Sequence, residues 1–146
     1  MAMYILVADD SVTVQKIIKL ALSKYDINIL KTSTLCETAK AFEQHSFDLH
    51  IIDGGLTGTK TPSDIQALLQ EEQKKKTIIL IGKSGKHHHS TYQQYNFPYI
   101  VKKPFSASLL KQTISKLGLV VKEKETNHKE STTTVSQKDL FSSQPI

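Results

Sequence analysis

Five short apolar runs alternate with stretches of helical periodicity along most of this chain, and this alternation restricts the fold more than any other feature. The apolar runs lie near residues 4–8, 27–31, 48–52, 77–82 and 98–102. The helical patterns lie near residues 12–24, 35–44, 62–74, 87–95 and 106–117. Strands that alternate with helices form parallel sheets with right-handed crossovers. The sequence therefore predicts an α/β fold, a doubly wound five-stranded parallel sheet with five helices.

The composition changes after the last helical pattern. Residues 122–146 are rich in Lys, Glu, Ser, Thr and Gln, and Leu140 and Phe141 are their only large apolar pair. Such a segment buries too little apolar surface to offset the entropy lost on ordering. We therefore expect one domain over residues 1–118 and a disordered polar tail over 119–146. The apolar pair is either a short docking motif or part of a solvated tail.

The charge of the chain is carried by lysine alone. The formal net charge is +5, and all 19 basic residues are lysine. Base-specific and bidentate phosphate contacts favour arginine, so we expect no direct binding of nucleic acid. The run Lys74–Lys76 either steers an acidic partner or forms a solvated helix end.

Nothing in the sequence predicts export or membrane insertion. The N-terminus runs into the first apolar run without a signal-peptide pattern. No apolar stretch approaches the roughly 18 residues that a membrane span needs. The single Cys36 cannot form an internal disulfide and fits a reducing compartment. We therefore expect a cytoplasmic protein.

Polar residues follow four of the predicted strands. Asp9 and Asp10 follow the first, Asp53 closes the third, Gly82–Ser84 follow the fourth and Lys102–Phe105 close the fifth. Parallel strands place their carboxyl ends, and the residues after them, at one edge of the sheet, where α/β proteins have their sites. The sequence therefore predicts that three carboxylates and a lysine gather in one cleft.

This set of side chains suits a divalent metal and phosphoryl transfer. Adjacent carboxylates repel each other, and Mg²⁺, which prefers hard oxygen ligands, relieves that repulsion. A carboxylate beside Mg²⁺ can attack phosphorus and form an acyl phosphate, so Asp53 is the candidate nucleophile. The metal and the Lys103 ammonium would neutralise charge on the transferring oxygens. Pro104 would fix the turn that carries this lysine.

Each of these features has a simpler interpretation when taken alone. An Asp-Asp pair at a strand end is more often a helix-capping device, and Asp53 could be a turn residue before two glycines. The run His87–His89 could bind a transition metal, but adjacent residues on a helix point in different directions, which favours a solvated loop or helix start. The order and spacing of the strand-end residues together favour the site.

These residues resemble the receiver domain of two-component response regulators. The resemblance rests on the run Ile5–Lys16, on the strand that ends at Asp53 and on the turn Lys103–Phe105, and it covers about residues 3–118. It implies a flavodoxin-like three-layer sandwich with the strand order 2-1-3-4-5.

The resemblance also implies a role for each site residue. Asp53 corresponds to the phospho-accepting aspartate. Asp10 corresponds to the direct Mg²⁺ ligand, and Asp9 to the acid that acts through a metal-bound water. Gly55 corresponds to the position that lends a backbone carbonyl to the metal, and Lys103 to the lysine that pairs with the phosphoryl group.

The sequence departs from the family pattern at the hydroxyl that normally follows the fourth strand. That Thr or Ser binds the phosphoryl group and moves inward on activation. Here the aligned pair is Gly82–Lys83, and Ser84, two residues later, could substitute only if the loop is shifted. Removing the hydroxyl removes about one hydrogen bond to a charged group, on the order of 1.5–3 kcal/mol. We therefore expect the response to phosphorylation to be weak or to take another route.

Two further departures affect the aromatic switch and the loop after the acceptor. The family's switch aromatic corresponds to Ile100, and the neighbouring Tyr99 is expected to point to the other face of the sheet. The proline that usually lies four residues after the acceptor is Thr57 here, so we expect an altered loop.

The resemblance implies a stand-alone receiver in a phosphorelay. A histidine kinase or phosphotransfer protein would phosphorylate Asp53, and the receiver would signal to a downstream protein by contact. The missing hydroxyl leaves an alternative open, a pseudo-receiver that binds partners without using phosphorylation. We do not expect an enzyme, because a phosphohydrolase with an aspartyl nucleophile needs a spaced carboxylate pair that Asp9–Ser11 does not provide.

Overall fold

The computed structural model describes residues 2–83 and 88–119, which form a parallel sheet with helices on both faces. The strands are β1 (Met3–Ala8), β2 (Ile27–Thr32), β3 (Leu49–Asp53), β4 (Thr77–Ile81) and β5 (Tyr99–Lys102). Their order is β2-β1-β3-β4-β5, and every neighbouring pair is parallel. The predicted fold class and strand order are therefore confirmed.

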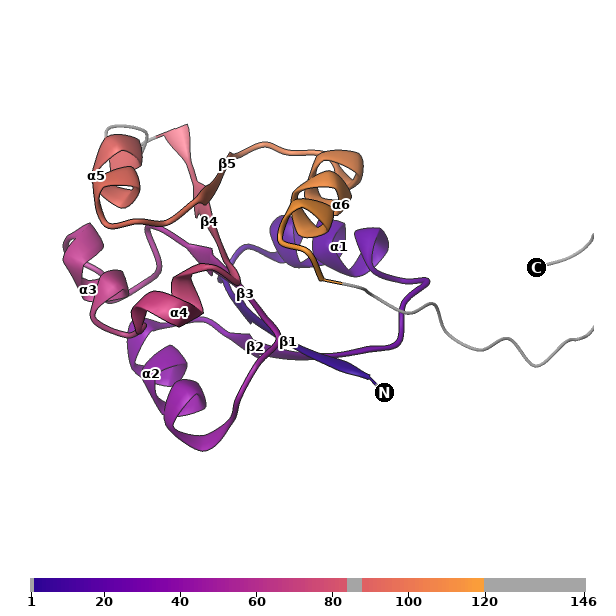
Figure 1. The fold of residues 1–146 in the computed structure, drawn as a ribbon, viewed down its shortest axis with the longest axis horizontal. Helices are drawn as coiled ribbons and strands as arrows, with labels where there is room; N and C mark the ends of the chain where they lie inside the picture. Colours follow the sequence, from indigo (N-terminus) through magenta and orange to yellow (C-terminus); the bar gives the residue numbers. More distant parts are fainter. Residues whose placement is uncertain (1, 84–87, 120–146) are drawn as a thin grey trace, which may run out of the picture.

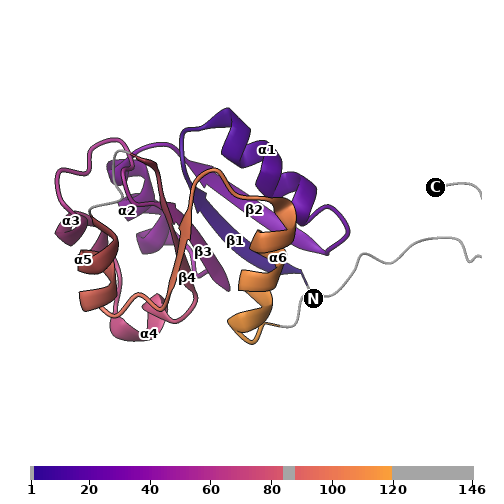
Figure 2. The same ribbon diagram turned by 90° about the horizontal axis from the view of Figure 1, so that it is seen from above.

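The helices lie in two layers, one on each face of the sheet. They are α1 (Val12–Ala21), α2 (Leu35–Gln44), α3 (Pro62–Gln66), α4 (Glu71–Lys74), α5 (His89–Gln94) and α6 (Ala107–Lys116). Figures 1 and 2 show α1 and α6 on one face, with α2, α3, α4 and α5 on the other. No helix among the described residues has the length and apolar character needed to cross a membrane.

Alternate residues of each strand supply the two halves of the core. Ile5 and Val7 of β1 pack toward α1 and α6, whereas Leu6 and Ala8 face the opposite layer. All five residues of β4 are buried, as expected for an inner strand covered on both faces. The core therefore fixes where each strand ends, and thus where the strand-end side chains lie.

The single helix predicted over residues 62–74 is wrong, because the structure has two short helices there. The first helix ends at Gln66, and the extended backbone of Gln70, with φ −83° and ψ 163°, precedes the second. The N–H group of Gln70 donates to Oε1 of Gln73 at 2.7 Å, and this side-chain contact caps α4. The described residues thus contain six helices instead of the predicted five.

The solvated helix end predicted for the lysine run is wrong for Lys74, which is only 2% exposed. Its ammonium group donates to Oε1 of Gln66 at 2.9 Å and to the backbone oxygen of Tyr95 at 2.6 Å. It also pairs with Glu71 and lies 5.3 Å from the centre of the Phe97 ring. Lys74 therefore joins α3, α4 and the end of α5 inside the fold.

The predicted tail lies outside the described residues, except for its first position, residue 119. The domain boundary at residue 118 and the disorder of 119–146 remain predictions.

Candidate metal and phosphoryl site

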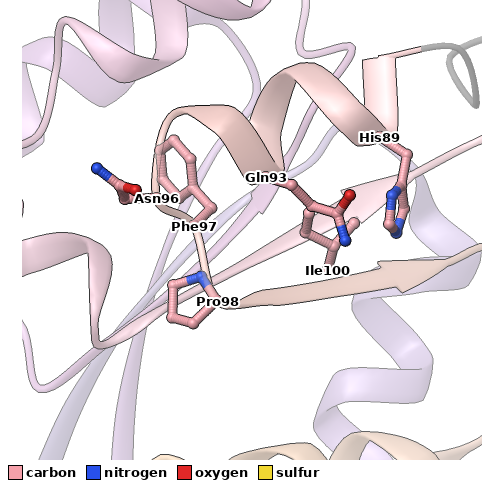
Figure 3. Close-up of a pocket in the computed structure, with 6 residues that line it drawn as sticks. All are labelled: His89, Gln93, Asn96, Phe97, Pro98 and Ile100. Carbon is pink, nitrogen blue, oxygen red and sulfur yellow. The ribbon is translucent and has the colours of Figure 1, made fainter.

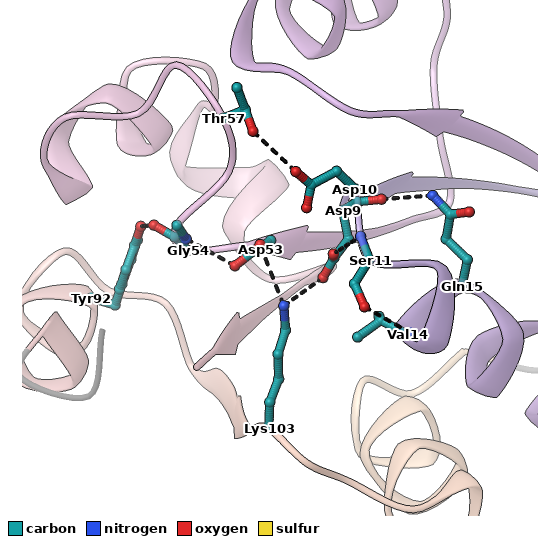
Figure 4. Close-up of polar contacts among 11 residues, drawn as sticks. Asp9, Asp10, Ser11, Val14, Gln15, Asp53, Gly54, Thr57, Tyr92 and Lys103 are labelled. Atoms are coloured by element: carbon teal, nitrogen blue, oxygen red, sulfur yellow. Dashed lines mark hydrogen bonds and ion pairs between the residues drawn. The ribbon is translucent and has the colours of Figure 1, made fainter. Parts of the chain in front are cut away.

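Three carboxylates and a lysine meet at the carboxyl edge of the central strands. Asp9 and Asp10 follow β1, Asp53 is the last residue of β3, and Lys103 follows β5. One carboxylate oxygen from each of the three aspartates lies within 4.8 Å of the others. In Figure 4, Lys103 reaches from the end of β5 toward the acids, with Nζ 2.8 Å from Oδ2 of Asp9 and 3.4 Å from Oδ2 of Asp53.

Asp9 is the buried member of this cluster and is fully inaccessible to solvent. Its Oδ1 accepts a hydrogen bond from the Ser11 N–H group at 2.8 Å. Its Oδ2 accepts no well-aligned hydrogen bond from the described residues and has only the close ion contact with Lys103. Burial, helped by the charge of Asp53, raises the pKa of Asp9 against the lowering effects of Lys103 and Ser11. The site thus holds a carboxylate oxygen with spare capacity for a cation.

Asp10 is exposed and is held by the loop that follows β3. Its Oδ2 accepts a hydrogen bond from the Thr57 hydroxyl at 3.1 Å. Thr57 stands where the sequence departs from the usual proline, and the departure therefore adds a contact to the site. The amide of Gln15 in α1 donates to the backbone oxygen of Asp9 at 2.7 Å and holds the β1–α1 turn. Neither contact is predictable from the sequence, because both depend on tertiary placement.

The donor set fits a divalent cation. Three carboxylates offer hard oxygen atoms, and Mg²⁺ is bound in proteins by one or two such groups together with water. Among residues 2–83 and 88–119, this is the one cluster of three or more metal-ligating side chains. The alternative metal site at His87–His89 includes His87, which lies outside the described residues.

Residues 5–115 match the family described as the response regulator receiver domain. The chain belongs to this family. No curated protein matches the chain.

Solved receiver structures share the fold at low sequence identity. A CheY-like receiver domain protein from Methanospirillum hungatei JF-1 is 18% identical with a TM-score of 0.68, over 81% of this chain and 95% of that one. Chemotaxis response regulator CheY4 of Vibrio cholerae is 18% identical with a TM-score of 0.64, over 80% and 99%. The receiver domain of a sensor histidine kinase from Pseudomonas aeruginosa PAO1 is 17% identical with a TM-score of 0.62, over 82% and 100%. That structure is described as having a magnesium ion coordinated in its active site cleft.

The loop after Asp53 is fixed by hydrogen bonds to the main chain of Gly54. Its N–H group donates to the backbone oxygen of Leu80 at 2.8 Å, and its carbonyl accepts from the Tyr92 hydroxyl at 2.9 Å. A Cβ atom on Gly54 would lie 3.1 Å from the Tyr92 ring, closer than Cβ atoms normally approach, so a larger residue here would push the ring aside. The next residue, Gly55, donates its N–H to Oδ1 of Asp53 at 2.9 Å.

Beside Asp53, Gly82 stands where receivers usually carry a hydroxyl. A Cβ atom added at Gly82 would meet none of the described residues within 4 Å. The pocket there has a volume of about 180 Å³ and is lined by Asp53, Gly54, Gly55, Ile81, Gly82, His88, Tyr92 and Lys103. Ser84, the candidate substitute for the hydroxyl, lies outside the described residues.

The side chains of Tyr99 and Ile100 point to opposite faces of the sheet. Ile100 packs with the cluster beneath α3 and α5. Tyr99 packs on the other face, where its hydroxyl donates to the backbone oxygen of Lys116 at 3.0 Å. The predicted orientation of Tyr99 is therefore confirmed, and its aromatic ring lies away from the α5 side.

Proposed function

We propose that this receiver accepts a phosphoryl group on Asp53 with the help of Mg²⁺ and signals by protein contact within a cytoplasmic phosphorelay. The donor would be a phosphohistidine of a histidine kinase or phosphotransfer protein. The observation that supports this most is the meeting of three carboxylates with one lysine ammonium at a single cleft.

In the proposed transfer, an oxygen of Asp53 attacks the phosphorus atom of the donor. The new P–O bond forms as the P–N bond to the donor imidazole breaks, and the imidazole nitrogen keeps the electron pair. Asp53 then carries an acyl phosphate. Lys103, with Nζ 3.4 Å from Oδ2 of Asp53, is placed to pair with the arriving phosphoryl oxygens.

Asp9, Asp10 and Asp53 would hold the metal, together with the backbone carbonyl of Gly55. The bound ion would neutralise phosphoryl charge in this acidic cleft. The buried Oδ2 of Asp9 favours this role because it lacks a well-aligned hydrogen bond among the described residues. The magnesium ion described in the active site cleft of the Pseudomonas receiver supports a metal at this site.

A pseudo-receiver that binds its partners without phosphorylation is the second candidate, and the lack of a side chain at Gly82 favours it. The phosphoryl group would find no switch hydroxyl on this residue. The aliphatic side chain of Ile100 likewise provides no aromatic ring at the usual place.

Intact mass spectrometry after incubation with acetyl phosphate and Mg²⁺ separates the two candidates. We expect one added phosphoryl group on the wild type, none on Asp53→Asn, and the wild-type result on Asp26→Asn, which changes an exposed acid at the other end of the sheet. An unmodified wild-type protein, or equal modification of Asp53→Asn, would contradict the assignment of the acceptor.

A further inference from the structure

A buried tyrosine connects helix α5 to the acceptor loop. Tyr92 lies in the middle of α5 and is fully inaccessible to solvent. Figure 4 shows its ring running from α5 to the loop after β3, where the hydroxyl donates to the carbonyl of Gly54 at 2.9 Å. Burial, with the charge of Asp53, raises the pKa of this hydroxyl above its usual range, so the group stays a proton donor.

The carbonyl that Tyr92 binds belongs to a peptide unit that also contacts Asp53. The carbonyl of Gly54 and the N–H of Gly55 belong to the same planar peptide unit. The carbonyl side of this unit accepts from Tyr92, and the N–H side donates to Oδ1 of Asp53 at 2.9 Å. Because the unit is rigid, a rotation that changes the hydrogen bond to Asp53 must also change the hydrogen bond to Tyr92.

Phosphorylation would weaken the bond on the Asp53 side. The free carboxylate is a charged acceptor, and hydrogen bonds to charged acceptors are roughly twice as strong as neutral ones. Once either oxygen carries a phosphoryl group, Oδ1 of Asp53 becomes a neutral ester or carbonyl oxygen. The peptide unit between Gly54 and Gly55 would then be free to turn, and its contact with Tyr92 would respond.

The contacts of Tyr92 continue to a groove between α5 and β5. Its ring meets the Phe97 ring edge to face, with 5.5 Å between the centroids. Phe97 in turn lines a groove of about 480 Å³, shown in Figure 3, together with His89, Gln93, Asn96, Pro98 and Ile100. The end of α5 is anchored separately, because Lys74 donates to the backbone oxygen of Tyr95. Motion of Tyr92 would therefore alter the wall of the groove, whereas the end of α5 stays attached to α4.

We propose that Tyr92 is the positioning residue that couples the state of Asp53 to α5 and Phe97 through the peptide unit between Gly54 and Gly55. This coupling rests on the proposed function of Asp53 as the phosphoryl acceptor. It provides a route that does not use the position of Gly82 or an aromatic ring at residue 100.

Amide and tyrosine ring spectra test this coupling without phosphorylation. Asp53→Asn removes the acceptor charge, so we expect it to shift the ring-carbon resonance of Tyr92 and the amide of Phe97. In the Tyr92→Phe background, which keeps the ring and removes the hydroxyl, the Phe97 shift should fall by about half or more, because the bond to the loop is gone. Tyr95→Phe is the matched control in the same turn, and in that background the Phe97 shift should keep its full size.

The same experiments separate this coupling from the proposed function. Equal Phe97 shifts in the wild-type, Tyr92→Phe and Tyr95→Phe backgrounds would overturn the role of Tyr92. If Tyr92→Phe does not fold, the single variant Asp53→Asn still tests the proposal. The role of Tyr92 is overturned if Asp53→Asn shifts the ring resonance of Tyr92 no more than that of Tyr95. A wild-type protein that takes no phosphoryl group but shows the coupled shifts would refute only the acceptor function.

Discussion

A buried histidine in β3 should make the stability of this receiver depend on pH below neutrality. His50 is 1% exposed and lies against the rings of Phe42 and Phe47. Its Nδ1 lies 2.9 Å from the hydroxyl of Thr77, which donates its only hydrogen to the backbone oxygen of Gln73 at 2.8 Å. The hydroxyl must therefore accept from Nδ1–H, so the ring carries a proton on that nitrogen.

The sign of the pH dependence follows from the lowered pKa of His50. Burial, and then the charge of Lys76, lowers that pKa from 6.5 to about 4. The unfolded chain therefore binds a proton at higher pH than the folded one. The free energy of unfolding is unaffected above about pH 6.5 and falls as the pH drops toward 4. At about 1.36 kcal/mol per pKa unit, the loss approaches about 3 kcal/mol in total, of which about 2 kcal/mol occurs between pH 7 and 5.

Urea denaturation at pH 7 and pH 5 measures this loss. The matched variant is His50→Asn, whose amide can donate to Thr77 but does not ionise. We expect the wild type to lose about 2 kcal/mol more than this variant over the interval, although the variant is less stable throughout because it lacks the ring. Equal losses in both proteins would refute the assignment of a neutral buried imidazole.

Two matched pairs of variants test other contacts by urea denaturation at pH 7. Lys74→Met removes a buried ammonium and leaves its oxygen acceptors without a partner, so it should cost about 2–3 kcal/mol. Lys75→Met changes a side chain that is 72% exposed and should cost less than about 0.5 kcal/mol; similar values for both would contradict the buried role of Lys74. Gly54→Ala places a Cβ atom 3.1 Å from the buried tyrosine ring of α5 and should cost about 1–3 kcal/mol. The Cβ atom of Gly82→Ala would meet none of the described residues within 4 Å, so this change should be neutral or stabilise by up to about 1 kcal/mol. A larger loss for Gly82→Ala than for Gly54→Ala would refute this packing.

The strands could be predicted because each one is a short apolar run in the local sequence. The run that ends at Asp53 is apolar and is buried in the structure, as is β4, whereas the edge strands β2 and β5 are only partly buried. The strand order came from the family resemblance, since periodicity does not specify which strands are neighbours. The break between α3 and α4 was not predictable from apolar spacing, because it depends on the side chain of Gln73 capping Gln70, and glutamine is not a strong capping signal.

The strand-end acids could be placed together because parallel strands share a carboxyl edge. The contacts that hold them were less accessible from sequence. Tyr92 donates to a main-chain oxygen 38 residues away, and Thr57 donates to an acid 47 residues away. In the sequence, Lys74 is one of three consecutive lysines and has no local sign of burial. Its ammonium group can be buried because acceptors from three separate segments contact it. Whether a polar side chain is buried depends on hydrogen-bond partners that are distant in the sequence, and no local pattern specifies them.

A Mg²⁺ titration followed by amide chemical shifts tests most directly whether the three acids form one cation site. We expect saturable shifts at Asp10, Asp53 and Gly55 in the wild type, and their loss in Asp53→Ala. Asp26→Asn should titrate as the wild type does. Shifts that do not saturate, or that persist unchanged in Asp53→Ala, would contradict a shared site at this edge of the sheet.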